Sequence, residues 1–193
     1  ERAARDHVLE VAVRGGHDAA IDRDLGVRAD WAHRVLLEHA ERIRTHPGVR
    51  RVEFSRAVPL QLAPDRAAVV VVARTIDAAD PGATLPLVGR PLAWQPDQPP
   101  PVWVSEAMVD LYGARVGGML ELPLAGGLHR FSVLGVWRDY ARQFGSVAMR
   151  AEDYQRITSD STRTDAAIWL HPGVQAADVS RELLQTLESR EVI

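Results

Sequence analysis

The sequence predicts a mixed α/β (α+β) fold with two lobes. Three observations support this prediction: the chain opens and closes with strand–helix–strand patterns, its centre is rich in expected strands, and a proline-rich stretch separates the first pattern from the centre. The β-α-β units at the two ends can share one sheet if the centre is inserted between them. We therefore expect a discontinuous α/β lobe at residues 1–85 and 160–193, and an inserted, small β-rich lobe with short helices at residues 86–159.

The first strand–helix–strand pattern occupies the N-terminal third of the chain. Residues 7–13 (HVLEVAV) are rich in β-branched side chains, which favour a strand, and a polar loop follows. Residues 30–45 predict a helix capped by Asp30. The segment His46-Pro47-Gly48 ends this helix, since proline cannot continue the helical hydrogen bonds and glycine accepts a positive φ. The expected buried face of the helix consists of Ala32, Val35, Leu36, His39 and Ile43.

Two extended segments and a proline-rich stretch come next. Residues 49–62 predict a strand, in which Pro59 marks an edge or a break. Residues 67–76 are apolar at nearly every position, so we expect a strand that is central or covered on both faces. Residues 77–101 contain seven prolines and predict a linker or a set of bends.

The centre of the chain predicts a strand, a helix and a hairpin. Residues 102–112 read as a short strand followed by a short helix, with Ser105 as the expected helix cap and Gly113 as the stop. Residues 119–136 predict a β-hairpin whose turn is formed by Ala125-Gly126-Gly127.

The last fifty residues predict short elements and a second strand–helix–strand pattern. In order, we expect a strand at 145–149, a helical turn at 151–157, a polar loop at 158–164, a strand at 165–171, a helix at 176–188 and the start of a strand at 191–193. The helix is amphipathic, and its apolar side consists of Val179, Leu183, Leu184 and Leu187. The tetrapeptide HPGV occurs at residues 46–49 and 171–174 in different contexts, so we interpret the match as coincidence.

Composition excludes several classes of chemistry. The 193 residues include no cysteine, which excludes thiol nucleophiles, thiolate metal sites and disulfides. They include no lysine, which excludes a phosphate-loop lysine and a Schiff base. The net charge of −3 gives no pull toward nucleic acid or anionic lipid. No signal peptide is visible and both ends look cut, so we expect a soluble piece of a larger protein.

The histidines and acidic loops do not define a metal site. No pair of histidines has the spacing of a local metal pair, so we interpret them as structural or surface residues. Residues 22–26 (DRDLG) resemble the opening of a calcium loop, but their glycine falls one place early and His33 occupies the position of the closing glutamate. The seven histidines are His7, His17, His33, His39, His46, His129 and His171.

A catalytic centre is not evident from the remaining polar residues. Ser105 lacks the flanking glycines of a nucleophile elbow, so a helix cap is the simpler interpretation. The glycine-rich residues 113–118 lead into a strand and predict a chain reversal, not a phosphate cradle. Aromatic and arginine side chains interleave over residues 137–144, which at this net charge favours an aromatic core with an arginine surface. Four carboxylates have no fixed spacing and define no acid–base pair: Asp139, Asp153, Asp160 and Asp165.

Several segments occur in the order found in one family of membrane proteins. They are residues 102–112 (VWVSEAMVDLY), 113–118 (GARVGG), 131–140 (FSVLGVWRDY) and 145–149 (GSVAM). Together they resemble the extracytoplasmic core domain of FtsX-like ABC transporter permeases of the MacB type, although Gly118 stands where the family usually has Asp. The segments WRDYARQF and YQRITSD are most similar to the ten-span branch of these permeases.

The resemblance implies a non-enzymatic, two-lobed periplasmic core domain on the outer face of the bacterial inner (plasma) membrane, as part of an integral membrane protein. Such a domain couples ATP-driven motion to export, to lipoprotein or lipid release, or to control of an envelope partner. The implied partners are an ABC ATPase subunit, the membrane through flanking helices outside this sequence, and a periplasmic or lipoprotein partner, without nucleic acid. The resemblance implies no catalytic residue, cofactor or metal ligand.

Two alternatives stay open. One is a small hydrolase-like enzyme with Ser105, or the region of His129 and Asp139, in its site; a pocket that converges on these groups would support it. The other is a stand-alone periplasmic interaction module with an apolar docking face around Trp94 or the proline-rich stretch.

Overall fold

The structure of the protein, a computed structural model, describes residues 8–12 and 40–188. The chain divides into two compact units: unit 1 comprises Glu1–Phe54 and Thr162–Ile193, and unit 2 comprises Ser55–Ser161. Unit 2 begins as early as Ser55, within β2 and before the proline-rich stretch. The physical reason is strand pairing, because β3 (Val69–Arg74) pairs in parallel with β8 (Ser146–Arg150) and so joins residues 55–85 to the β-rich centre.

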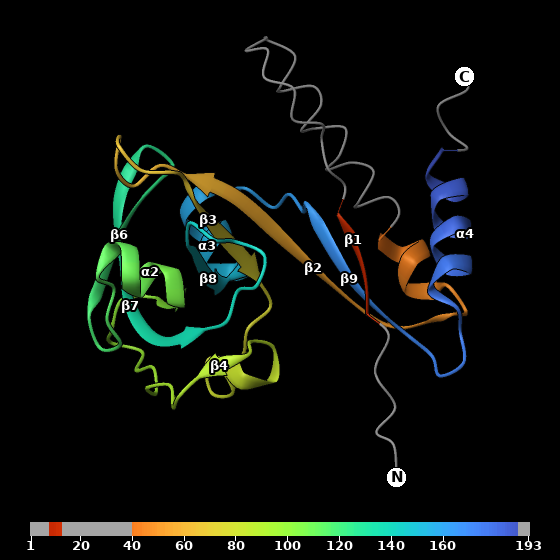
Figure 1. The fold of residues 1–193 in the computed structure, drawn as a ribbon, viewed down its shortest axis with the longest axis horizontal. Coiled ribbons are helices and arrows are strands. Elements are labelled where there is room, and N and C mark those ends of the chain that lie inside the picture. Colours follow the sequence, from red (N-terminus) through yellow and green to blue (C-terminus); the bar gives the residue numbers. More distant parts are fainter. Residues whose placement is uncertain (1–7, 13–39, 189–193) are drawn as a thin grey trace. The chain divides into compact units, whose positions relative to one another are not determined.

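Unit 1 is built from the two ends of the chain. Strand β1 (Val8–Ala12) pairs antiparallel with β9 (Asp165–Leu170), from Val8 opposite Trp169 to Ala12 opposite Asp165. In the strand order β9 lies between β1 and β2 (Val49–Leu60), whose first six residues belong to unit 1. Helix α4 (Ala176–Glu188) has the predicted bounds. The predicted strands at 7–13 and 165–171 are confirmed (Figure 1).

The core of unit 1 lies between this sheet and the helices. Residues 40–45 are helical and the helix ends at Thr45, as His46-Pro47-Gly48 predicts; Asp30 and the first part of the expected helix lie outside the described residues. Val179 and Leu183 of α4 are buried, as predicted, and the side chains of Leu184 and Leu187 lie outside the described residues. The buried cluster consists of Ile43, Val49, Ala166, Ile168, Leu170, Val179 and Leu183.

The two HPGV segments form neighbouring turns in unit 1. In each segment the valine N–H donates to the histidine carbonyl, at 2.9 Å for Val49 and 3.2 Å for Val174. The N–H of His171 donates to the carbonyl of Gly48 at 3.0 Å, so the turns lie side by side. His46 accepts from the Gly48 N–H at Nδ1 and contacts Glu182 of α4 through Nε2 at 2.9 Å. The repeated tetrapeptide therefore has a shared structural role, although the flanking elements differ.

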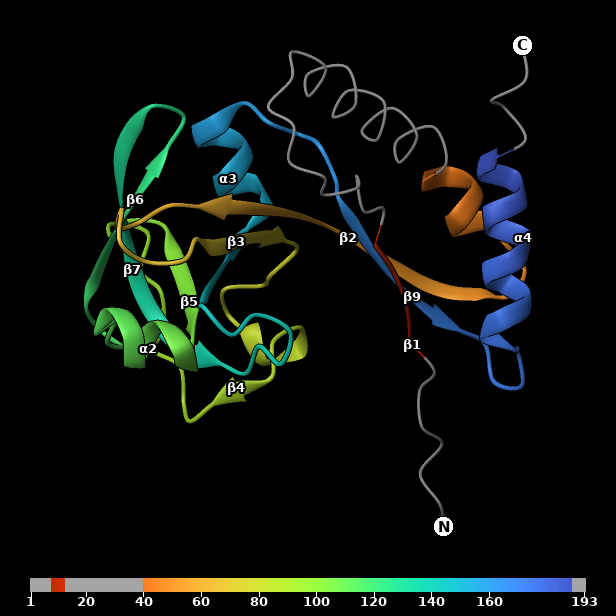
Figure 2. The same cartoon turned by 45° about the horizontal axis from the view of Figure 1, so that its top comes forward.

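Unit 2 is a curled mixed sheet with two short helices (Figure 2). Its strand order is β2, β3, β8, β5, β7, β4, with β6 paired to β7. Beyond β3 and β8, the elements are β4 (Leu87–Val88), β5 (Pro101–Ser105), α2 (Glu106–Tyr112), β6 (Met119–Leu124), β7 (Gly127–Trp137) and α3 (Ala151–Thr158). The predicted hairpin is confirmed, and Ala125 and Gly126 at its tip have φ of 50° and 76°, as a two-residue turn with the twist of the strands requires. The expected central position of the apolar strand 67–76 is also confirmed.

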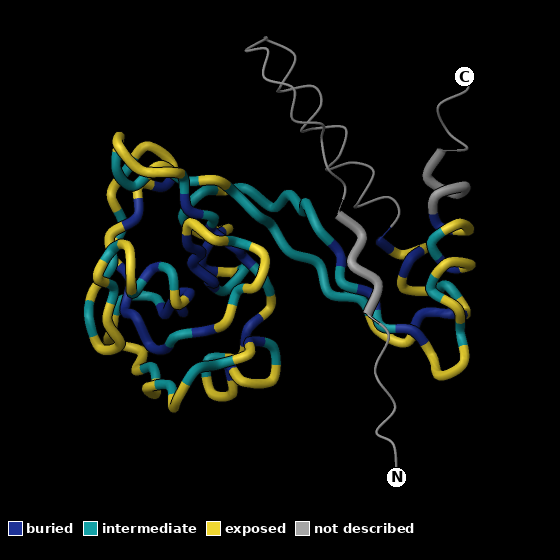
Figure 3. The backbone as a smooth tube through the Cα atoms, viewed as in Figure 1, coloured by how far each residue is buried: buried dark blue, intermediate teal, exposed yellow. Residues whose placement is uncertain are grey.

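The central strands of unit 2 are covered on both faces. On β5, Val102 and Val104 face a core cluster that also contains Met108 of α2 and Tyr154 of α3. Trp103, between them, faces a second cluster with Leu134 and Trp137, among other residues. Figure 3 shows the buried residues gathered along these strands. Two-sided burial explains the unbroken apolar runs, because a strand exposed on one face would alternate.

The proline-rich stretch covers the second of these faces. It contains the 3-10 helix η1 (Pro81–Ala83) and strand β4, which pairs with the end of β7. Leu85 is buried in the second core cluster, and Leu87 and Trp94 pack against it. The prediction of bends is therefore right, and the prediction of a linker is wrong. The prolines shape a segment that is folded onto the sheet and contributes to its core.

Candidate functional site: the Trp94 hollow

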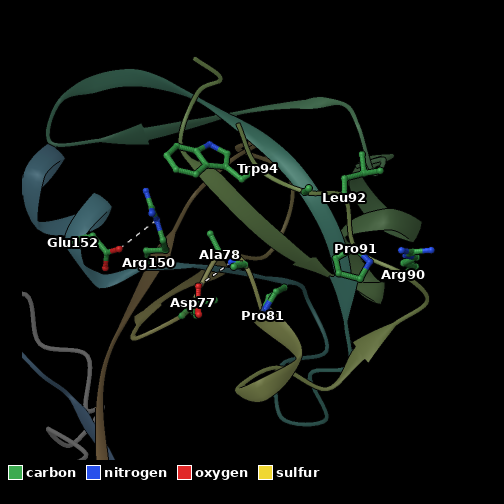
Figure 4. A pocket seen from close by; sticks show the side chains of 12 residues that line it. Asp77, Ala78, Pro81, Arg90, Pro91, Leu92, Trp94, Arg150 and Glu152 are labelled. Atoms are coloured by element: carbon green, nitrogen blue, oxygen red, sulfur yellow. Dashed lines mark hydrogen bonds and ion pairs between the residues drawn. The ribbon is translucent and has the colours of Figure 1, made fainter. Parts of the chain in front are cut away.

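A hollow with a volume of about 830 Å³ lies beside the proline-rich stretch of unit 2. We call it the Trp94 hollow. It is lined by the segment that directly follows β3, by the segment after β4 and by the junction of β8 with α3 (Figure 4). The lining residues are Ile76, Asp77, Ala78, Ala79, Pro81, Arg90, Pro91, Leu92, Ala93, Trp94, Arg150 and Glu152. This volume is in the range of ligand or peptide sites in proteins.

Trp94 and Arg150 form a fixed wall of the hollow. The Arg150 guanidinium carbon lies 4.7 Å from the centroid of the Trp94 ring, and Figure 4 shows the two groups facing each other. The indole N–H donates to the carbonyl of Pro99 at 3.1 Å. Arg150 Nε donates to Oδ2 of Asp153 at 2.5 Å and lies 3.4 Å from Glu152. The indole N–H of Trp94 and the Nε of Arg150 therefore both have protein partners, and the guanidinium stacks on the indole ring.

The charges around the Trp94 hollow are mixed. Asp77 accepts the Ala79 N–H at 2.9 Å, and Glu152 is the exposed partner of Arg150. Arg90 is exposed and lies on the opposite side of the hollow from Arg150 in Figure 4. Since both signs occur, the hollow has no strong preference for an anion or a cation. Its largely apolar lining offers a binding surface rather than a set of reacting groups.

A smaller hollow of about 430 Å³ lies beside α2. The Tyr112 hydroxyl donates to the carbonyl of Ala67 at 3.1 Å, and the Arg66 guanidinium lies 5.0 Å from the Tyr112 ring centroid. Leu111 and Phe144 line this hollow and expose 46% and 59% of their surface, enough to form a small apolar patch.

Ser105 occupies the predicted helix-cap position, but its hydroxyl does not cap the helix. The Ser105 backbone is extended where α2 begins, and Oγ accepts the buried N–H of Ser146 at 2.9 Å instead. The hydroxyl therefore joins β5 to β8. Gly113 ends α2 in the left-handed region, with φ of 67°, as expected. The chain reversal predicted for residues 113–118 is confirmed by the Gly118 N–H, which donates to the Arg115 carbonyl at 2.9 Å.

The structure does not bring the other predicted polar groups together in either hollow described here. His129 and Asp139 line neither of them. Asp139 pairs with Arg142 at 3.0 Å, and Asp165 accepts the Thr164 hydroxyl at 2.7 Å. Within residues 8–12 and 40–188, no three histidine or carboxylate side chains are placed to hold a metal ion. His7, His17, His33, His39 and residues 22–26 lie outside the described residues.

The aromatic residues near the end of β7 divide between core and surface. Trp137 is buried, as predicted, but Tyr140 and Phe144 expose 84% and 59% of their surface. The expectation of a wholly aromatic core in this segment is therefore wrong. The reason is that the chain leaves the sheet after Trp137 and forms a turn in which Asp139 Oδ1 accepts the Ala141 N–H at 3.1 Å.

Sequence reasoning missed a polar network at the ends of unit 2. The Arg56 Nε and the Tyr154 hydroxyl both donate to Oδ2 of Asp160, at 3.0 and 3.1 Å. Burial, and then the neighbouring Asp160 carboxylate, raises the pKa of Tyr154, so its hydroxyl stays protonated and donates at neutral pH. Arg56 and Asp160 are 104 positions apart, and no sequence motif links them.

No protein-family model and no curated protein matches the chain. Solved structures do match its fold. The periplasmic region of MacB from Actinobacillus actinomycetemcomitans superposes with a TM-score of 0.51 at 14% identity, covering 79% of this chain and 72% of that one. The extracellular domain of the noncanonic ABC-type transporter YknZ from Gram-positive bacteria gives 0.53 at 10% identity, covering 79% and 81%.

The chain therefore has the fold of an extracytoplasmic domain of an ABC-type transporter. Within this class, its fold is similar to those of the MacB periplasmic region and the YknZ extracellular domain, in agreement with the resemblance found in the sequence. The mixed α/β class is confirmed with it. In the part of the chain that the structure describes, no helix is both long and apolar enough to cross a bilayer.

Proposed function

We propose that this chain is a non-enzymatic extracytoplasmic domain of an ABC transporter permease, which passes ATP-driven motion to export, to lipoprotein or lipid release, or to control of an envelope partner. The observation that carries the proposal is the fold shared with the MacB and YknZ domains over 79% of the chain. The division of the chain into two units, joined at two places, suits a part that works by changing shape.

The proposal places the domain on the periplasmic side of the inner membrane. Helices encoded next to this segment attach it there, and an ABC ATPase subunit binds the parent permease on the other side. The test is to express the complete parent reading frame with an affinity tag and to isolate membranes. We expect the tagged protein in the inner-membrane fraction, together with an ABC ATPase. A reading frame that encodes no membrane segment, or a purified parent with no ATPase, would overturn the proposal.

We also propose that the domain contacts an envelope partner and that the Trp94 hollow is the contact site. The hollow combines a rigid Trp94–Arg150 wall with the exposed Leu92, which suits an apolar side chain of a partner. A photo-crosslinking residue placed at Leu92 in the parent permease should give a discrete adduct in cells. The matched control is Leu128, on the β6–β7 hairpin, which is also exposed. Equal labelling at both positions would contradict the assignment of this site.

A hydrolase-like enzyme is the alternative with less support. The residues nominated for it, Ser105 and the His129–Asp139 region, lie outside the lining of both hollows, and the Ser105 hydroxyl is engaged with a buried backbone amide. A Ser105→Ala variant that keeps full transport-coupled ATPase activity in the parent complex would argue against catalysis by this residue.

A further inference from the structure

Two segments of unit 2 meet at one edge of β7. The pairing of β5 with β7 skips Leu134, which forms a bulge in β7. The carbonyl of Leu134 accepts the Leu92 N–H at 2.8 Å. The preceding carbonyl, that of Val133, accepts the Gly117 N–H at 2.8 Å. A Cβ at Gly117 would lie 3.5 Å from Cδ1 of Leu92. The segment after β4 and the turn before β6 therefore lie side by side.

Three exposed apolar side chains come from these two segments and the start of β6. Leu92, Val116 and Met119 expose 48%, 42% and 45% of their surface. Val116 directly precedes Gly117 in the turn, and Met119 begins β6, where its sulfur lies 4.0 Å from the hydroxyl of Ser132. We call Leu92, Val116 and Met119 the edge patch. Apolar side chains that gather from separate segments of the surface indicate a contact site, whereas single ones do not.

The charged groups beside the edge patch are mainly arginines. Arg90 and Arg115 are exposed and lie in the same two segments as the patch. Neither of them forms an ion pair within residues 8–12 and 40–188. Next to Met119 along β6, Glu121 lies opposite Arg130 and 3.8 Å from it, so this carboxylate already has a partner. Unlike the Trp94 hollow, the patch therefore has two unpaired positive charges beside it, on a chain whose net charge is −3.

We propose that the edge patch and these two arginines bind an acidic peptide segment of the envelope partner, in which an apolar side chain lies between carboxylates. The apolar side chain covers the edge patch, and the carboxylates accept hydrogen bonds from Arg90 and Arg115. A guanidinium suits this role because its planar fork matches both oxygens of a carboxylate. An anionic bilayer fits less well, since the net negative charge of the chain opposes adsorption. The inference rests on the envelope contact proposed above and names the chemistry of the partner.

The test measures the binding of a synthetic peptide to the 193-residue chain. The probe is a fluorescent peptide composed of leucine and glutamate, and its control peptide has glutamine in place of each glutamate. By fluorescence anisotropy we expect the glutamate peptide to bind more tightly by about tenfold. The difference should shrink as salt is added, because exposed charges are screened. The double variant of Arg90→Gln with Arg115→Gln should lose the preference for glutamate, and Leu92→Ser should weaken the binding of both peptides.

Arg181→Gln is the matched control, because it removes an exposed arginine of α4 in unit 1 and leaves the edge patch intact. It should keep the preference for glutamate. Equal affinity for the two peptides, no binding of either, or the same loss in Arg181→Gln would overturn the proposal. Vesicles of phosphatidylglycerol and sedimentation of the chain alone test two other occupants. Vesicle binding or self-association that disappears in the double variant would replace the peptide by a membrane or by a second copy of the chain.

A failure of this test is distinguishable from a failure of the proposed function. Peptide binding is measured on the chain by itself, whereas the transporter assignment depends on the membrane fraction and the ATPase of the parent protein. A parent that lacks both, with a chain that still prefers the glutamate peptide, would overturn the transporter assignment and support the peptide site. A parent that has both, with a chain that does not distinguish the two peptides, would overturn the peptide site alone.

Discussion

The hydroxyl of Ser105 accepts a hydrogen bond from the backbone N–H of Ser146, with an Oγ–N distance of 2.9 Å. Both residues are buried, with 2% and 0% of their surface exposed. The bond ties the end of β5 to the start of β8, one position beyond the paired residues Val104 and Val147. A serine that looks like a helix cap in the sequence thus completes the hydrogen bonding of the sheet, where a buried N–H without a partner would be costly.

Replacement of Ser105 by alanine should lower the free energy of unfolding by about 1–3 kcal/mol, because it leaves the buried Ser146 N–H without its acceptor. Urea denaturation measures the loss. Ser132→Ala is the control, since the hydroxyl of this largely buried serine contacts only the Met119 sulfur, at 4.0 Å. Hydrogen exchange separates the two interpretations of Ser105. In Ser105→Ala we expect faster exchange of the Ser146 amide. Faster exchange confined to the amides in the first turn of α2 would instead indicate a capping role.

Gly145→Ala should destabilise unit 2 by about 2 kcal/mol or more, since both the backbone and the packing oppose a side chain. Gly145 has φ of 110°, and a Cβ there would lie 2.8 Å from the Met108 sulfur. Gly82→Ala is the control, because a Cβ at Gly82 meets only ordinary contacts at 3.6 Å and beyond. Thermal and urea unfolding of both variants would test this. A loss for Gly145→Ala no greater than for Gly82→Ala would contradict the structure at this position.

Arg150→Met should lower the free energy of unfolding by about 2–3 kcal/mol, because the fully buried Asp153 carboxylate loses a partner at 2.5 Å. Arg156 remains as a second partner and limits the loss. Arg181→Met, which removes an exposed pair with Asp178 on α4, should cost at most about 0.5 kcal/mol. The fluorescence of Trp94 should also change in Arg150→Met, since the guanidinium lies over its ring. Similar losses in both variants would mean that Asp153 is satisfied without Arg150.

Tyr154 should make stability depend on pH in the alkaline range. The folded protein raises the pKa of this hydroxyl above its ordinary value of 10.0, mainly through burial and then through the Asp160 charge. Between the two pKa values the folded state holds a proton that the unfolded state has released, so stability falls as the pH rises. The stabilisation is complete below about pH 10 and is lost above it. Urea midpoints from pH 8 to 11 should therefore fall more steeply in the natural protein than in Tyr154→Phe, and parallel curves would refute this.

Much of the fold was accessible from local sequence patterns. The hairpin was predictable because Ala125-Gly126-Gly127 suits a tight turn between alternating strands, and the bounds of α4 followed from its apolar spacing. The proline-rich stretch was harder, because a local pattern of bends does not show whether the segment lies in solvent or on a sheet. The burial of Leu85 decides that question.

The candidate site was less predictable than the elements around it. The sequence indicates an apolar docking face around Trp94 or the proline-rich stretch, but Arg150, which contacts the Trp94 ring, lies at the end of β8. The hydrogen bond between Arg56 and Asp160 was invisible for the same reason, since the two residues are far apart in the chain. Hydrogen bonds between distant residues depend on strand order and register, which a single sequence does not encode locally.

The sequence by itself determined the classes of chemistry that are excluded, the order of strands and helices, and the ordered segments that resemble one transporter family. Each of these depends on residue types or on short-range periodicity. Only the tertiary structure decided where unit 2 begins, which faces of its sheet are covered and what Ser105 and Asp160 bind. The physical reason is that a buried polar group takes whichever partner the folded chain brings within about 3 Å, and that partner belongs to the packing of the whole unit.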